Sequence, residues 1–271
     1  MNYFQSLRNK IKKNKAVICV VGLGYVGSTI LEKFDEAGFK TIGIDKDKRK
    51  IKKKSKNKKM ILTDNYKFVH LADVIIIALP TPLTSTMSPD LSYIKSCITK
   101  MRKYIKKGQL ISLESTTYPG TTEEVIGEFI KKRKFILSKN YFLVYSPERI
   151  SPELKVKNKK VKYYLYNIPK VCAGYSTKCK ILGKELYKKI TKKVVEASSL
   201  KIAETTKMIE NVFRSTNIAL VNELKMFLNK IITKNVGKNA YANPDIAGIP
   251  IKISPALTDR FGCGITALNL F

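Results

Sequence analysis

The chain has 271 residues, 44% of them hydrophobic and 27% charged, which is the ordinary composition of a globular protein with an apolar core. No apolar run reaches the roughly 18 residues that a membrane-spanning helix needs, and the run 16–21 is too short for a signal peptide, so we expect a cytoplasmic protein. Lys and Arg number 52 against 21 Asp and Glu, a net charge of +31 that attracts polyanions, although the lysines are spread along every segment without an aromatic-basic recognition motif.

Strand and helix patterns alternate along most of the chain. In chain order we expect a helix at 2–14, a strand at 16–21, a helix ending near 37, a strand at 40–44, a lysine-rich helix at 46–59, a strand at 74–79, a helix at 90–105, a strand at 109–113, a helix at 122–132, a strand at 141–145, a basic loop at 150–169, a strand at 171–173, a helix at 177–190 and a strand at 194–195. This alternation predicts an α/β domain over residues 1–196, with a Rossmann-like, doubly wound parallel sheet and helices on both sides.

The pattern then changes to one long helix. Residues 199–232 contain no Gly or Pro, and apolar residues recur at Ile202, Ile209, Val212 and Leu220. Helices of this length often pair with another chain. We therefore expect a central helical segment at 197–236, followed by a tail at 237–271 without a clear period.

A glycine-rich turn joins the first buried strand to the next helix. Glycines there permit a tight turn and let a pyrophosphate approach the backbone at the helix N-terminus. Asp45 ends the second strand, where a carboxylate can accept hydrogen bonds from a ribose diol. An acidic residue favours NAD over NADP, although Lys46, Lys48 and Arg49 nearby weaken that preference. The alternative is a glycine turn without a ligand. The residues assigned to the cofactor here are Gly22, Gly24, Tyr25, Val26, Gly27 and Asp45.

Two further strands end in polar loops. Residues 80–82 read Pro-Thr-Pro, and residues 114–117 read Glu-Ser-Thr-Thr. In an open parallel sheet, ligands lie beyond the carboxyl ends of the strands, so we expect Pro80, Thr81 and Thr116 beside the nicotinamide end of the cofactor. The alternative is that each loop only terminates its strand.

Glu148 follows another strand, in the sequence Ser-Pro-Glu-Arg. A carboxylate there can orient or activate water, and the alternative is a salt bridge with a nearby lysine. The only histidine, His70, has no accompanying cluster of ligands. We interpret it as structural and expect no metal site.

The long helix carries a second set of polar residues. Lys207 and Asn211 are four residues apart and share a face, which Arg214 continues. An ammonium beside an amide can stabilise an oxyanion. The alternative is a solvated charged face. When these residues are considered by themselves, they favour this alternative.

The cysteine pattern argues against disulfides. The count is odd and no Cys-x-x-Cys pair occurs, so we expect free thiols in a reducing compartment. The five cysteines are Cys19, Cys97, Cys172, Cys179 and Cys263.

Seven segments match one known family in order and spacing. They are Val21-Gly-Leu-Gly-Tyr-Val-Gly27, Pro80-Thr-Pro-Leu83, Pro89-Asp-Leu-Ser-Tyr93, Glu114-Ser-Thr-Thr-Tyr-Pro-Gly-Thr-Thr122, Ser146-Pro-Glu-Arg149, Ile168-Pro-Lys-Val171 and Glu210-Asn-Val-Phe-Arg-Ser-Thr-Asn-Ile-Ala-Leu-Val-Asn-Glu-Leu224. The chain resembles the UDP-glucose/UDP-N-acetylglucosamine/GDP-mannose dehydrogenase family over residues 2 to about 232, nearest the branch that oxidises UDP-N-acetylglucosamine or its epimers.

The resemblance implies a two-step oxidation with NAD as cofactor. The C6 alcohol of a UDP-N-acetylhexosamine is oxidised to an aldehyde, a cysteine captures the aldehyde, and a second oxidation and hydrolysis give a uronic acid for surface polysaccharide. By motif match, Lys207 and Asn211 stabilise the oxyanion, while Thr116 and Glu148 position water and substrate. The long helix matches the family's dimerisation helix. We therefore expect a UDP-sugar substrate, a homodimer, and no specific nucleic-acid or membrane partner.

The chain departs from the family in three places. The stretch 59–72 is shorter than in the family. The Gly-Gly-His-Cys motif that carries the nucleophile is absent, and Cys263 lacks the adjoining histidine, so we do not carry the nucleophile onto it. The chain ends at Phe271, before the family's C-terminal UDP-binding domain, and residues 233–271 resemble nothing known. We therefore expect that domain to be missing and the chain to be truncated.

Two alternatives to the dehydrogenase stay open. One is a truncated, inactive remnant that binds NAD with little or no turnover. The other is a basic nucleic-acid-binding protein, which accounts for the charge but not for the matched segments.

Overall fold

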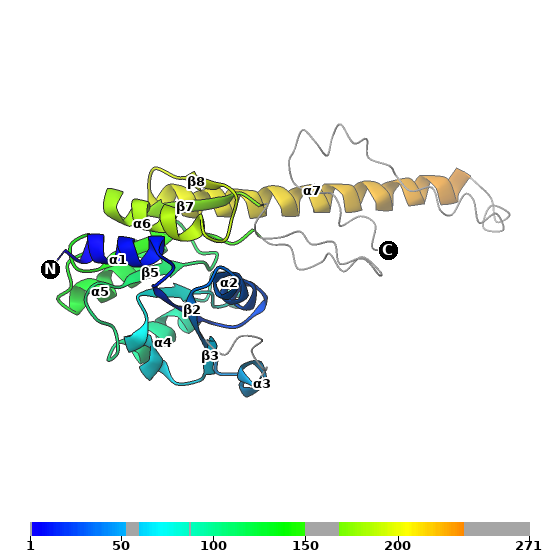
Figure 1. Cartoon of the computed structure of the whole chain (residues 1–271). Helices are drawn as coiled ribbons and strands as arrows, with labels where there is room; N and C mark the ends of the chain where they lie inside the picture. The colour runs from blue at the N-terminus through cyan, green and yellow to red at the C-terminus, as the bar shows by residue number, and fades with distance from the viewer. Residues whose placement is uncertain (1, 53–59, 87, 150–167, 236–271) are drawn as a thin grey trace. The chain divides into compact units, whose positions relative to one another are not determined.

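The computed structural model describes residues 2–52, 60–86, 88–149 and 168–235 (Figure 1). Part of the helix expected at 46–59, most of the loop expected at 150–169, and Cys263 lie outside the described residues. The chain divides into two compact units, Met1–Met208 and Ile209–Phe271.

The first unit is built on an eight-stranded sheet in the order β3-β2-β1-β4-β5-β6-β7-β8. From β1 the chain extends the sheet first toward β3 and then, starting with β4, in the opposite direction. In folds of this kind, cofactors bind beyond the carboxyl ends of the strands at which the order reverses, here β1 and β4. The strands are β1 (Val17–Val21), β2 (Lys40–Ile44), β3 (Met60–Thr63), β4 (Val74–Ile77), β5 (Leu110–Leu113), β6 (Phe142–Tyr145), β7 (Lys170–Gly174) and β8 (Val194–Glu196).

Helices cover both faces of the sheet. Residues of η1, α4, α5 and the start of α7 pack against one face, and residues of α1, α2 and α6 pack against the other. Alternate residues of the central strands therefore enter different cores, which explains why β1 and β4 are apolar at every position. The helices are α1 (Tyr3–Lys12), α2 (Tyr25–Glu36), α3 (Lys48–Ile51), η1 (Tyr66–Leu71), α4 (Ser92–Met101), η2 (Thr122–Gly127), α5 (Glu128–Lys132), α6 (Thr177–Tyr187) and α7 (Leu200–Asn235). The α/β, doubly wound prediction is confirmed.

Three details differ from the predictions. The sheet is not parallel throughout, because β7 pairs antiparallel with β6, whereas β8 is parallel to β7. A strand buried on both faces has the same hydropathy pattern in either direction, so the sequence did not reveal this reversal. The predictions also omitted β3 and η1, and the helix expected at 122–132 begins as the wider π-helical segment η2.

The long helix expected from residue 199 is present as α7. It begins in the first unit and continues into the second, where many of its large apolar side chains are exposed. None of the helices in the described ranges is long and apolar enough to cross a membrane.

Candidate functional site

The turn between β1 and α2 depends on two of its glycines for its shape. Gly22 has a φ of +94°, and a Cβ atom there would lie 2.5 Å from the carbonyl oxygen of Ala78. A Cβ atom on Gly27 would lie 1.8 Å from the carbonyl oxygen of Gly22. The first glycine is therefore required by the turn, and the third by the close approach of α2 to that turn.

Gly24 differs from these two because a Cβ atom there would meet nothing within 4 Å. It is the N-cap of α2 and has an ordinary φ of −71°. The open space beside its backbone therefore adjoins the positive end of the helix dipole. Tyr25 is exposed and Val26 is half-buried at the first turn of α2. These residues fit the pyrophosphate of a dinucleotide.

Asp45 follows β2 and is almost completely buried. Its carboxylate accepts hydrogen bonds from the backbone amides of Leu23 (2.7 Å) and Asp47 (2.9 Å), and it forms an ion pair with the Lys50 ammonium (3.0 Å). Burial raises the pKa of Asp45, but these hydrogen bonds and Lys50 lower it further than burial raises it. The carboxylate is therefore held charged, and it connects the glycine turn directly to the end of β2.

The loops after β4 and β5 are hydrogen-bonded to each other. The Thr81 hydroxyl donates to the carbonyl oxygen of Thr116 (2.7 Å). The Ser115 hydroxyl accepts from the amide of Leu79 (3.1 Å) and donates to its carbonyl oxygen (2.6 Å). Pro80 is exposed and Thr116 is half-buried. The structure thus brings together the two loops that the sequence predicted to lie beside the nicotinamide.

Glu148 belongs to a buried network of charges. The Lys170 Nζ lies 2.7 Å from Glu114 Oε2 and 2.8 Å from Glu148 Oε2. The backbone amide of Arg149 donates to the other Glu148 oxygen (2.7 Å). Because β7 is antiparallel to β6, its first residue, Lys170, lies at the carboxyl ends of β5 and β6. The salt bridge that the sequence left open as an alternative for Glu148 is therefore present.

Two carboxylates share one ammonium in this network. Burial raises the pKa of Glu114 to about 7, the neighbouring Glu148 raises it too, and Lys170 and the Tyr187 hydroxyl oppose them. Burial lowers the pKa of Lys170, but the two carboxylates raise it well above its usual range. The Tyr187 hydroxyl donates to Glu114 and also contacts the Ser112 hydroxyl (2.7 Å). The sequence assigned no role to Glu114, Lys170 or Tyr187, although the first two lie inside matched segments.

A second buried carboxylate fixes the start of α7. Glu204 accepts hydrogen bonds from the amides of Gly120 (2.5 Å) and Thr122 (2.9 Å) and from the Thr122 hydroxyl (2.6 Å). Lys207, three residues further along α7, is only 7% exposed. No sequence pattern pointed to Glu204, because its partners are more than 80 positions away in the chain.

Two other residues predicted on the long helix belong to the second unit. Asn211 and Arg214 are both exposed there. Their predicted relationship to the substrate stays a prediction.

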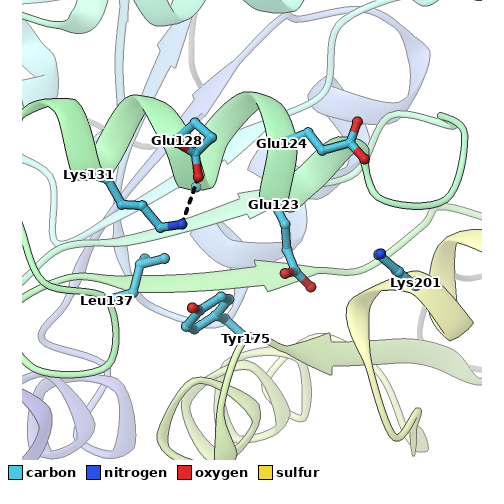
Figure 2. Close-up of a pocket in the computed structure, with 8 residues that line it drawn as sticks. Glu123, Glu124, Glu128, Lys131, Leu137, Tyr175 and Lys201 are labelled. Carbon is cyan, nitrogen blue, oxygen red and sulfur yellow. Dashed lines mark hydrogen bonds and ion pairs between the residues drawn. The ribbon is translucent and has the colours of Figure 1, made fainter.

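A cavity of about 210 Å³ opens between η2, α5 and the start of α7 (Figure 2). Figure 2 shows the Glu123 side chain directed toward Tyr175 and Lys201, while Lys131 pairs with Glu128 at 2.7 Å. None of the residues predicted to bind the cofactor lines it.

The described residues contain no group of three or more His, Cys, Asp or Glu side chains that could hold a metal ion. His70 is exposed on η1. Cys19, Cys97, Cys172 and Cys179 are buried free thiols. Burial raises the pKa of the Cys97 thiol to about 12, so it is unreactive at neutral pH.

Comparison with known proteins agrees with this geometry. The profile of the UDP-glucose/GDP-mannose dehydrogenase family, NAD binding domain, matches residues 16–66 and 51–191. Protein CapL of Staphylococcus aureus is 36% identical over 230 residues, covering 79% of this chain and 53% of its own length. The UDP-N-acetyl-D-glucosamine 6-dehydrogenase of Pseudomonas aeruginosa is 34% identical over 233 residues, with the same two coverages.

A solved structure supports the same likeness. The UDP-D-ManNAc dehydrogenase of Pyrococcus horikoshii superposes with a TM-score of 0.71 at 26% identity, covering 88% of this chain and 59% of that one. The chain spans about half the length of the curated relatives it matches.

Proposed function

Because the chain belongs to the UDP-glucose/GDP-mannose dehydrogenase family and carries its NAD-binding domain, we propose that it supplies the NAD-binding half of a nucleotide-sugar 6-dehydrogenase. The substrate proposed is a UDP-N-acetylhexosamine, whose C6 alcohol is oxidised to a uronic acid for surface polysaccharide. The observation that carries the proposal is the open space at Gly24, next to the N-terminus of α2 and braced by the Leu23–Asp45 hydrogen bond.

The cofactor residues divide by the part of NAD that each would hold. The backbone from Gly22 to Gly27 would bind the pyrophosphate, and Asp45 would accept hydrogen bonds from the adenosine ribose. Pro80, Thr81 and Thr116 would border the nicotinamide, because the loops that carry them meet at the carboxyl ends of β4 and β5. NAD, when bound, accepts the hydride removed from the sugar.

Glu148 and Thr116 would act on the substrate at the same edge of the sheet. Glu148 is held by Lys170 and is therefore suited to orienting a water molecule or the sugar. Thr116, in the loop after β5, would share this role. Lys207 and Asn211 on α7 would stabilise the oxyanion that forms during oxidation. These roles rest on motif match and on the positions of Glu148, Thr116 and Lys207 in the first unit.

The second unit supports a homodimer. Six of the exposed large apolar side chains of α7 recur at spacings of three, four and seven residues, which places these six along one side of the helix, while Ile218 is exposed on the opposite side. Burying them against a second copy would remove this surface from water. The exposed residues of this stripe are Ile209, Val212, Phe213, Leu220, Leu224 and Phe227.

The function is tested by adding NAD and UDP-N-acetylglucosamine to the purified chain and following both NAD binding and reduced nicotinamide. NAD binding supports the proposed NAD-binding half, whether or not reduced nicotinamide forms. Formation of reduced nicotinamide would in addition show that the chain catalyses the oxidation by itself, and its absence favours the inactive remnant. Steeply salt-dependent DNA binding without NAD binding would reject both in favour of the basic nucleic-acid-binding alternative.

A further inference from the structure

The ends of α4 and α5, with the loops that lead from them into β5 and β6, carry a concentration of positive charge. Residues 100–109 and 131–140 together contain ten lysines and arginines and no acidic residue. At the average frequencies of this chain, twenty residues would contain about four cations and one or two acids. The excess is therefore specific to these two segments, and the high net charge of the whole chain does not explain it.

The fold brings the two segments together at one edge of the sheet. β5 and β6 are parallel neighbours in which Leu110 pairs with Phe142, and just before this pair the Gly108 amide donates a hydrogen bond to the Asn140 carbonyl oxygen (2.7 Å). Because parallel strands begin at the same edge, both segments lie at the amino ends of the strands. The residues proposed to bind the cofactor lie at the carboxyl ends, on the opposite edge.

Most of these cations are available to a partner. Of the ten, only Lys131 is paired with a carboxylate in the described part of the chain, that of Glu128. Lys100 and Arg133 lie over aromatic rings. Six further cations are exposed, namely Arg102, Lys103, Lys107, Lys132, Lys134 and Lys139.

Two large aliphatic side chains are exposed at the same edge. Ile136 is 53% exposed, in a turn held by a hydrogen bond from its amide to the Asn140 side chain (2.8 Å). Leu71 is 52% exposed at the end of η1. The Gln109 side-chain amide donates to the carbonyl oxygen of Ala72 (2.8 Å), which connects the end of η1 to the loop before β5. The exposed cations therefore have an exposed aliphatic side chain on either side of them.

This combination fits the surface of a bilayer rich in anionic phospholipids. Lysines are attracted to the headgroups of such a surface, and aliphatic side chains enter the boundary between headgroups and acyl chains. Nucleic acid fits less well, because its recognition relies on arginines at base edges and on exposed aromatic rings for stacking. Here five of the six exposed cations are lysines, and the nearby Tyr104 and Phe135 are half-buried.

We propose that residues 100–109 and 131–140, together with Leu71, form a basic edge that docks the chain on anionic phospholipid bilayers. Contrary to the expectation from the sequence, the chain would then have a membrane partner, although none of the described helices could span a membrane. A surface that lies on a bilayer needs no spanning segment. Because the basic edge is opposite the cofactor residues, docking leaves the cofactor site open.

Co-sedimentation of the whole chain with phospholipid vesicles tests this docking. We expect binding to vesicles of equal parts phosphatidylcholine and phosphatidylglycerol to be at least about tenfold tighter than to phosphatidylcholine alone, and to weaken with added salt. Equal binding to both vesicles, or to neither, would overturn the proposal. Removing three charges from the basic edge should weaken the binding at least about tenfold. The variant is Lys103→Gln/Lys107→Gln/Lys139→Gln.

A matched control separates the basic edge from the net charge. Lys193 accepts a hydrogen bond from the amide of Lys170, which lies at the carboxyl ends of β5 and β6, so the lysines around it are near the opposite edge. Removing three exposed lysines there should weaken binding less than about threefold. The control variant is Lys188→Gln/Lys192→Gln/Lys193→Gln. Equal losses in the two variants would show that only the net charge matters and would overturn the proposal.

A tryptophan reporter tests insertion directly, because the chain contains no tryptophan of its own. The fluorescence of Ile136→Trp should shift to shorter wavelength with the anionic vesicles, whereas that of Val195→Trp, exposed on β8, should not. An unshifted Ile136→Trp would contradict docking through this edge. A DNA duplex that binds more tightly than the vesicles, and loses affinity in the basic-edge variant, would assign the edge to nucleic acid instead. None of these measurements involves NAD, so their failure would leave the proposed function in place.

Discussion

The carboxylate of Glu204 accepts a 2.9 Å hydrogen bond from the backbone amide of Thr122, which lies 82 positions earlier in the chain. Together with its bonds from the Gly120 amide and the Thr122 hydroxyl, this contact fixes the first turns of α7 to the loop after β5. That loop also contains Thr116, and Lys207 lies one turn further along α7. Glu204 therefore connects the two segments proposed to contact the substrate.

Replacing Glu204 tests this connection. Glu204→Gln keeps the shape of the side chain but removes the charge that strengthens three hydrogen bonds, so we expect the free energy of unfolding to fall by about 1–3 kcal/mol. Urea denaturation measures the change. Glu223→Gln, at an exposed position of the same helix, should stay within about 0.5 kcal/mol of the unmodified chain. An effect of Glu204→Gln no larger than this control would show that the contact contributes little.

Gly27 should tolerate no side chain. Because a Cβ atom there would lie 1.8 Å from the Gly22 carbonyl oxygen, Gly27→Ala requires the backbone of α2 or of the turn to move. We expect a loss of about 3 kcal/mol or more, visible as a lower melting temperature. An unchanged melting temperature would mean that α2 does not pack on the turn in this way.

The buried Glu114 should make stability depend on pH. Its folded pKa of about 7 lies above its ordinary value of 4.5, so between these values the folded chain binds more protons than the unfolded chain. Its contribution is therefore complete below about pH 4.5 and is lost as the pH rises through about 7. Relative to Glu114→Gln, the unmodified chain should lose about 1–3 kcal/mol of unfolding free energy across that interval, measured by denaturation at several pH values. Parallel pH profiles for the two proteins would refute this.

Lys170 should be needed to keep two carboxylates buried together. Lys170→Met leaves Glu114 and Glu148 without their shared cation, and we expect a loss of about 3–5 kcal/mol. Adding Glu114→Gln to Lys170→Met removes one of the stranded carboxylates, so the double variant should recover part of that loss. A double-mutant cycle measures the coupling, and strictly additive effects would argue against a shared network.

The sequence predicted the parts of the site that depend on local pattern or on sheet order. The glycine turn and Asp45 follow directly from their places at strand ends, and Thr81 and Thr116 meet because the carboxyl ends of neighbouring parallel strands share an edge. The α/β class and the long helix could be predicted because the spacing of apolar residues is a local pattern.

The buried charge networks could not be predicted in this way. Lys170 reaches Glu114 and Glu148 only because β7 is antiparallel to β6. The hydropathy pattern of a strand does not depend on its direction, so the sequence could not predict this pairing. In the sequence, Glu204 cannot be distinguished from other acidic residues of a charged helix. Its partners include backbone amides of a loop that is distant in the chain. Both cases depend on pairings between segments that only the folded chain brings together.

The central claim is that the backbone beside Gly24 holds the pyrophosphate of NAD, and calorimetric titration of NAD into the unmodified chain and into Gly24→Ala tests it most directly. An alanine Cβ meets no protein atom within 4 Å there, so the variant should fold with a stability within about 1 kcal/mol of the original while occupying space that the cofactor needs. We predict one NAD bound per unmodified chain and binding at least about tenfold weaker in Gly24→Ala. Folded, unmodified protein that gives no heat with NAD, or a variant that binds NAD equally well, would contradict the account.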